Sequence, residues 1–116
     1  MSEAHCGTRT EVPYGTLDLL VLKTLDAMGP MHGFGIARRI EQVAGHLVRL
    51  NQGSIYPALL RLHQNGWIAT AWGSSEHGRR AKFYSITRKG RTQLQSAIDD
   101  WQRATALVSR FLEELP

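Results

Sequence analysis

The sequence predicts a mainly α-helical fold that carries one small β-hairpin, and three observations lead to this prediction. Apolar residues recur at intervals of three and four over three consecutive segments, which is the spacing of one helix face. Two runs rich in aromatic and β-branched residues then flank a polar, glycine-containing turn, as in a hairpin. Finally, the C-terminal segment repeats apolar positions in a heptad pattern. A chain of 116 residues suits a single domain.

The first two helices are defined by apolar faces and by glycines that end them. We expect the first over residues 16–28, with Thr16 as its N-cap and Gly29 as its stop. The second is expected to begin near Gly33 and to end at Gly45. Its buried face would hold Ile36, Ile40, Val43 and Ala44.

The third helix follows a short connector, residues 46–50. We expect it to begin between Asn51 and Ser54 and to close at Gly66. Pro57 would then fall in the first turn, where a proline costs least. The buried face would hold Ile55, Leu59 and Leu62.

A hairpin is expected next, with strands over residues 67–73 and 81–86 and a polar tip between them. Trp67 and Trp72 are interpreted as hairpin and core aromatics. The tip and its flank carry three cations that repel one another, which makes sense if phosphates lie nearby. The alternative is an ordinary solvated turn. The three cations are Arg79, Arg80 and Lys82.

The last helix is expected to start at Thr87 as N-cap and to present an apolar seam. Such a seam must be covered, and a second copy of the chain is one solution. Packing against the first helix is the alternative, and both faces can be used. The seam comprises Leu94, Ala97, Trp101, Ala104, Val108, Phe111 and Leu115, of which the first six are assigned to a homodimer interface.

The charge distribution narrows the classes of function. The net charge is +4, and the excess of positive charge lies between residues 31 and 92, between two acidic ends. This pattern favours a face turned toward a polyanion, although an uneven solvated surface would give the same count. No apolar run reaches membrane-spanning length, the N-terminus lacks a signal-peptide core, and a single cysteine, Cys6, fits the cytoplasm.

Catalysis and metal binding find little support in the sequence. The five histidines are scattered singly, without a cysteine or carboxylate at metal-ligand spacing. No nucleophile motif or phosphate-cradling glycine loop is present. We therefore expect neither an enzyme nor a protein that carries a cofactor or metal.

The second and third helices form a candidate helix-turn-helix, in which the start of the third helix meets base edges of DNA. The alternative is a plain three-helix core with polar outer faces. The start of the second helix could offer backbone N–H groups to a phosphate. The predicted DNA-binding residues are Gln52, Gly53, Ser54, Tyr56, Pro57 and Arg61 of the third helix, His32 and Gly33 of the second, and Arg79, Arg80 and Lys82 of the hairpin.

Trp101 is the large aromatic residue of the last helix, and its neighbours on the seam, Ala97 and Ala104, are small. A flat ring beside small residues can leave a cleft between two subunits that accepts a small apolar or aromatic effector. The alternative, which the residues alone favour, is that Trp101 only packs in the core or the dimer interface.

Four stretches of the chain resemble the PadR family of bacterial transcriptional regulators: GTLDLLVLKTL (15–25), GPMHGFGIARRIE (29–41), LNQGSIYPALLRLHQNGWI (50–68) and RRAKFYSITRKGR (79–91). The resemblance covers residues 14–112. It implies a winged helix-turn-helix with a C-terminal dimerisation helix, and a cytoplasmic DNA-binding homodimer that is usually a repressor. It also implies that Tyr56 lies at the operator and that the cationic hairpin is a wing over the minor groove or backbone.

In some multidrug-responsive relatives, a tryptophan of the last helix lines a ligand pore at the dimer interface, and Trp101 lies in the corresponding region. Relatives that respond to phenolic acids have a longer C-terminal region, so this chain resembles the short subfamily. The expected organisation is an N-terminal tail (1–13), a winged helix DNA-binding domain (14–87) and a dimerisation helix (88–116).

The predicted function is sequence-specific binding of a palindromic operator. A ligand carrier that uses the fold as a scaffold and an adaptor that pairs its last helix with another protein are the alternatives.

Overall fold

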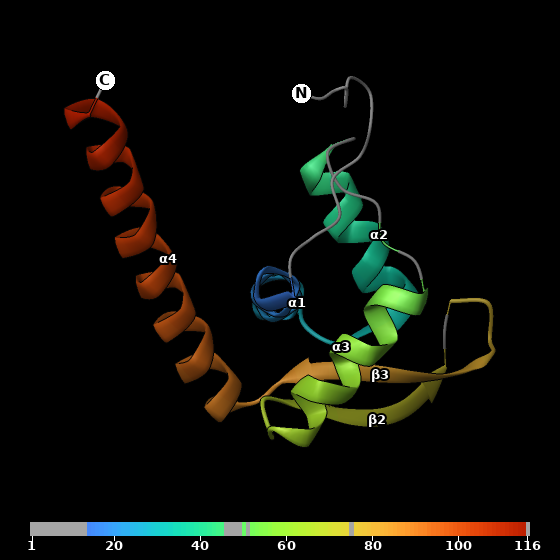
Figure 1. The fold of residues 1–116 in the computed structure, drawn as a ribbon. Helices are drawn as coiled ribbons and strands as arrows, with labels where there is room; N and C mark the ends of the chain where they lie inside the picture. The colour runs from blue at the N-terminus through green and yellow to red at the C-terminus, as the bar shows by residue number, and fades with distance from the viewer. Residues whose placement is uncertain (1–13, 46–49, 51, 75, 116) are drawn as a thin grey trace.

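The computed structural model describes residues 14–45, 50, 52–74 and 76–115 (Figure 1). The expected tail (1–13), with Cys6, and most of the connector (46–49 and 51) lie outside the described residues. Within the described part, no helix combines the length and the hydropathy needed to cross a membrane. The elements are α1 (Tyr14–Met28), β1 (Met31–His32), α2 (Gly33–Ala44), α3 (Gln52–Gln64), β2 (Ile68–Ser74), β3 (Arg80–Ile86) and α4 (Arg88–Glu114).

The core lies where α1, α2 and α3 meet the base of a small sheet. The predicted buried face of α3 is confirmed, since Ile55, Leu59 and Leu62 are almost fully buried. The face predicted for α2 is only half right: Ile36 and Ile40 are buried, but Val43 is 72% exposed and Ala37 takes its place in the core. Apolar spacing marks a helical stripe, but it does not show how far along the helix the neighbouring elements reach.

The sheet has three antiparallel strands in the order β1-β3-β2, so the predicted two-stranded hairpin is incomplete. The hairpin of β2 and β3 is present, and β1 adds Met31 and His32 opposite Tyr84 and Phe83. A two-residue strand has no periodicity of its own and exists only through this long-range pairing. Figure 1 shows α3 crossing one face of the hairpin, whose loop end extends beyond the helix.

The start of α1 and the place of Pro57 in α3 differ from the predictions, whereas α3 begins within the predicted range. Helix α1 begins at Tyr14, so Thr16 lies inside its first turn and is not the N-cap. Tyr14 continues the spacing of Leu17 and Val21, which explains the longer helix. Helix α3 begins at Gln52, so Pro57 is its sixth residue, beyond the first turn, and has no N–H to donate to the carbonyl of Gly53.

The predicted N-cap of the last helix is confirmed. The Thr87 hydroxyl accepts a hydrogen bond from the Gly90 N–H at 3.0 Å and donates to the carbonyl of Gly66 at 2.8 Å. The first part of α4 packs against α1, and Arg91 forms an ion pair with Asp26 at 3.3 Å. Beyond Ile98 every described residue of α4 is exposed, and the helix rises away from the other elements (Figure 1).

Candidate nucleic-acid interface

The start of α3 presents its polar and small residues on the side opposite the core. Gly53, Tyr56 and Pro57 are exposed and Ser54 is half-buried, whereas Ile55, Ala58 and Leu59 face inward. Gln52 begins the helix, but its side chain lies outside the described residues. The helix therefore turns the predicted reading residues outward because its opposite stripe is held by the core.

Tyr56 is positioned by close contact with α2. A Cβ atom added at Gly33 would lie 2.7 Å from the Cε1 atom of Tyr56 and 2.9 Å from both its Cζ and its hydroxyl oxygen. Gly33 itself is buried. The absence of a side chain at Gly33 therefore leaves the space in which the phenol ring of Tyr56 is seated.

Tyr84 of β3 is a second residue near Tyr56. Burial raises the pKa of Tyr84 above its ordinary value, and the proximity of Tyr56 raises it further. Tyr56 is therefore close to the start of α2 and near Tyr84 of the sheet. The beginning of α3 is joined in this way to the strand that carries the hairpin cations.

His32 caps the N-terminus of α2. Its Nδ1 atom accepts a hydrogen bond from the Gly35 N–H at 3.0 Å, and its ring meets Phe34 in a stack and Phe83 edge-on. The Gly35 N–H, one of the groups expected to bind a phosphate, is therefore already used within the chain. Contact of His32 and Gly33 with DNA stays a prediction.

Arg61 has an intramolecular partner. Its guanidinium lies 2.7 Å from the carboxylate of Asp18, and the two side chains are only 24% and 22% exposed. The pair connects α3 to α1 across 43 residues of sequence. Spacing on α3 alone could not reveal this carboxylate on α1, and contact of Arg61 with DNA stays a prediction.

The hairpin, called the wing from here on, carries its cations around an exposed indole. Arg79, Arg80 and Lys82 are all exposed. The guanidinium carbon of Arg80 lies 4.8 Å, and the Lys82 Nζ atom 5.7 Å, from the ring centroid of Trp72. Trp67 packs partly against the core and Trp72 lies on the hairpin, as expected of hairpin and core aromatics, but Trp72 is 60% exposed and is no part of the core.

The strand register places the wing cations and α3 on one side of the sheet. Lys82 pairs with Trp72 and Arg80 with Ser74, while Tyr84 pairs with Thr70. Alternate residues of a strand point to the same face, so Tyr84, Lys82 and Arg80 share one face. We define the α3–wing surface as the α3 residues Gly53, Tyr56 and Pro57 together with the wing cations Arg80 and Lys82, all of which are exposed.

The C-terminal part of α4 forms an uncovered apolar strip in the single chain. Among the residues predicted for the dimer seam, Trp101, Ala104, Val108 and Phe111 are exposed and Ala97 is half-buried. Leu94 is only 4% exposed because the chain's own core buries it, so its assignment to the dimer interface is wrong. The full strip, which we call the α4 strip, consists of Trp101, Leu107, Val108, Phe111, Leu112 and Leu115, with Leu107 and Leu112 missed by the heptad analysis.

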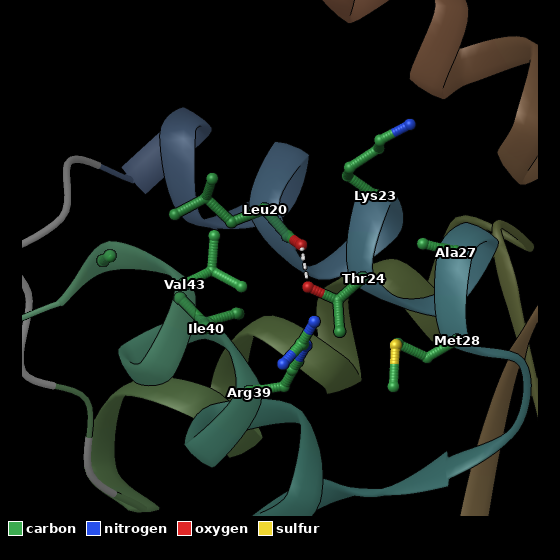
Figure 2. Close-up of a pocket in the computed structure, with 9 residues that line it drawn as sticks. Leu20, Lys23, Thr24, Ala27, Met28, Arg39, Ile40 and Val43 are labelled. Carbon is green, nitrogen blue, oxygen red and sulfur yellow. Dashed lines mark hydrogen bonds between the residues drawn. The ribbon is translucent and has the colours of Figure 1, made fainter.

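A groove of about 390 Å³ lies between α1 and α2 (Figure 2). The Thr24 hydroxyl in it donates to the Leu20 carbonyl at 2.7 Å, so the polar group of Thr24 is satisfied within α1. The groove is therefore largely apolar, with the cations of Lys23 and Arg39 among its lining residues. The remaining lining residues are Leu20, Ala27, Met28, Ile40, Val43 and Ala44.

Comparison with known proteins agrees with this architecture. Residues 21–96 match the model of the transcriptional regulator PadR-like family. A transcriptional regulator from Clostridium thermocellum superposes with a TM-score of 0.75 at 25% identity, over 84% of this chain and 93% of that one. A PadR-like transcriptional regulator from Bacillus cereus superposes with a TM-score of 0.72 at 26% identity, over 84% of this chain and 92% of that one.

A 37.1 kDa protein of a Streptomyces fradiae transposon is 39% identical over 90 residues, which are 78% of this chain and 24% of that protein. The match to the family model covers most of the chain and includes the helix-turn-helix and the wing. The family resemblance and the predicted winged, mainly helical fold are both confirmed. The chain belongs to the PadR-like family of transcriptional regulators, which bind DNA and are not enzymes.

Proposed function

We propose that this regulator recognises a specific operator through the α3–wing surface. The observation that carries the proposal is that the start of α3 and the wing cations lie on one face of the sheet, joined through Tyr56 and Tyr84. A helix N-terminus can meet base edges in the major groove while neighbouring cations neutralise phosphates. Base contacts then supply specificity, and Arg80 and Lys82 supply affinity.

The regulator acts as a homodimer on a palindromic operator, as a repressor. The α4 strip supports this, because an apolar strip of this length is costly in water and a second copy can cover it. Charge complementarity also favours a second copy. The end of α4 carries the acidic residues Glu113 and Glu114. The apolar groove between α1 and α2 is lined in part by the basic residues Lys23 and Arg39.

DNA binding is tested by fluorescence anisotropy with duplexes that the protein selects from genomic fragments. Arg80→Ala/Lys82→Ala should weaken binding and reduce the slope of log affinity against log salt by roughly 1.8, since each lost phosphate contact removes about 0.9. Arg103→Ala/Arg110→Ala on α4 is the control with an equal change in charge. Equal binding of selected and scrambled duplexes by the wild type would exclude sequence-specific recognition and favour the carrier or adaptor alternatives.

The dimer is tested by analytical ultracentrifugation at micromolar concentration. Phe111→Asp places a charge in the α4 strip and should give a monomer, whereas Ser109→Asp, on the opposite side of the helix, should leave the dimer intact. A monomeric wild type, or a Phe111→Asp protein that still dimerises, would contradict this assignment.

An effector site at Trp101 is part of the same proposal. The indole is exposed in the single chain and has small residues, Ala97 and Ala104, along the helix. A flat apolar effector between two copies would change the separation of the two reading helices, for which the geometric expectation is about 34 Å. Titration with a planar aromatic dye should quench the tryptophan fluorescence of the wild type and not that of Trp101→Ala. Equal quenching of both proteins would exclude this site.

A further inference from the structure

Trp72 is an exposed indole at a position where the fold itself gains little from a large ring. It lies on β2 near the loop end of the wing, beyond the part of the hairpin that packs on the core. Its neighbours along the strand, Ala71 and Gly73, are small. A tryptophan that is 60% exposed leaves much apolar surface in water, which suggests that a partner covers it.

The surroundings of the indole identify the chemistry of that partner. Arg80 and Lys82 both lie within cation–π distance of its ring, at 4.8 and 5.7 Å. Two cations gathered on one aromatic ring repel each other, and an anion beside them relieves this repulsion. An indole also has an N–H donor and no acceptor, which suits a phosphate oxygen. The site therefore fits the sugar–phosphate backbone of a nucleic acid, in which anionic phosphates alternate with sugar rings.

The strand register places Trp72 on the same face of the sheet as Lys82 and Tyr84. Trp72 pairs with Lys82, and two residues further along β3 from Lys82 toward α4 lies Tyr84, which neighbours Tyr56 of α3. All three strand residues point to the same face of the sheet. A duplex that meets Tyr56 would therefore pass over the same face that carries Trp72.

We propose that Trp72 is a DNA-contacting residue of the wing: its indole packs against the sugar–phosphate backbone and holds Arg80 and Lys82 toward the phosphates on either side. The inference rests on the proposed DNA-binding function and adds to it a residue interpreted from the sequence as a hairpin or core aromatic. The competing role is a cross-strand pair that only stabilises the hairpin, with or without DNA.

Substitution separates the two roles. Trp72→Leu should weaken binding of the selected duplex roughly ten-fold, because two cation–π contacts and a ring contact are lost, while Trp72→Phe keeps an aromatic face and should lose less. The thermal midpoints of both variants should stay close to that of the wild type. Gln95→Ala is the control, since Gln95 is an exposed residue of α4 outside both the α3–wing surface and the α4 strip, and its loss should leave the affinity for DNA unchanged.

Fluorescence gives a readout that a purely structural role would not change. In a Trp101→Phe background, subtracting the signal of Trp72→Phe/Trp101→Phe isolates the emission of Trp72. The saturating selected duplex should reduce quenching of this emission by acrylamide at least two-fold, because the backbone of the duplex covers the ring.

The outcomes are distinguishable. If the wild type binds DNA but acrylamide reaches Trp72 equally with and without the duplex, or if Trp72→Leu binds like the wild type, the inference is wrong and the proposed function stands. If Arg80→Ala/Lys82→Ala also binds like the wild type, the wing is not the contact surface and the proposed function fails as well.

Discussion

Replacing Gly33 by alanine tests the contact that seats Tyr56. The added methyl would lie 2.7 Å from the Tyr56 Cε1 atom, whereas ordinary van der Waals contact begins at 3.4 Å, so the ring must move by about 0.7 Å (3.4 minus 2.7) or more. The atoms in the way belong to the far end of a flexible side chain. The phenol should therefore swing aside without opening the core.

Gly33→Ala should weaken DNA binding while it leaves the free energy of unfolding nearly unchanged. Alanine gains about 1 kcal/mol over glycine in a helix interior and less at the first position, which Gly33 occupies in α2, so this gain offsets only part of the cost of moving the ring. We expect the free energy of unfolding to change by less than about 1 kcal/mol. The displaced hydroxyl of Tyr56 should lose its contact with DNA, which at about 1–1.5 kcal/mol corresponds to a five- to ten-fold loss of affinity.

The assay is anisotropy with the selected duplex, together with urea unfolding. Gly15→Ala is the control, because a methyl there meets nothing within 4 Å. If Gly33 acts through the hydroxyl of Tyr56, the double variant with Tyr56→Phe should bind no more weakly than the weaker single variant. Wild-type affinity in Gly33→Ala, or additive losses in the double variant, would refute this reasoning.

Three further predictions concern stability. Gly90→Ala should lower the free energy of unfolding, measured in urea, by about 3 kcal/mol, because its methyl would overlap the backbone carbonyl oxygen of Trp67, which cannot swing aside. A loss below about 1 kcal/mol would contradict the packing of α4. Because the pKa of Tyr84 is raised in the folded state, the contribution of Tyr84 to stability should be constant below about pH 10 and fall as pH rises above it, and Tyr84→Phe should reduce that alkaline fall. An identical alkaline transition in the variant would count against burial of the phenol. Arg61→Ala should lower the free energy of unfolding by about 1–2 kcal/mol, because it leaves the half-buried Asp18 carboxylate without this ion pair, and Arg61→Ala/Asp18→Ala should lower it by less than the sum of the single changes. Additive losses of free energy would show that the ion pair contributes nothing.

Most of the local structure could be predicted because it depends on residues close together in the sequence. The stripe of Ile55, Leu59 and Leu62 predicts a buried helix face, and it is buried. Thr87 has capping chemistry directly before a helical pattern, and it caps α4. The basic turn between two strand-like runs is the loop end of the wing.

The features that could not be predicted all depend on a partner far away in the sequence. Arg61 on α3 has the charge of a DNA contact, yet Asp18 on α1 holds its guanidinium. Gly33 suits close approach to a duplex, yet Tyr56 occupies that space. A residue type states which contacts are chemically available, but only the packed chain decides which neighbour takes them first.

The sequence by itself determined the mainly helical fold with one hairpin, the cations of that hairpin and the apolar strip at the end of the chain, because periodicity and composition act over a few turns. Only the tertiary structure decided that Leu94 belongs to the core, that Trp72 faces solvent between two cations, and that Met31 and His32 form a third strand. An apolar or charged pattern defines a face of an element, whereas what covers that face is set by pairing and packing between distant elements.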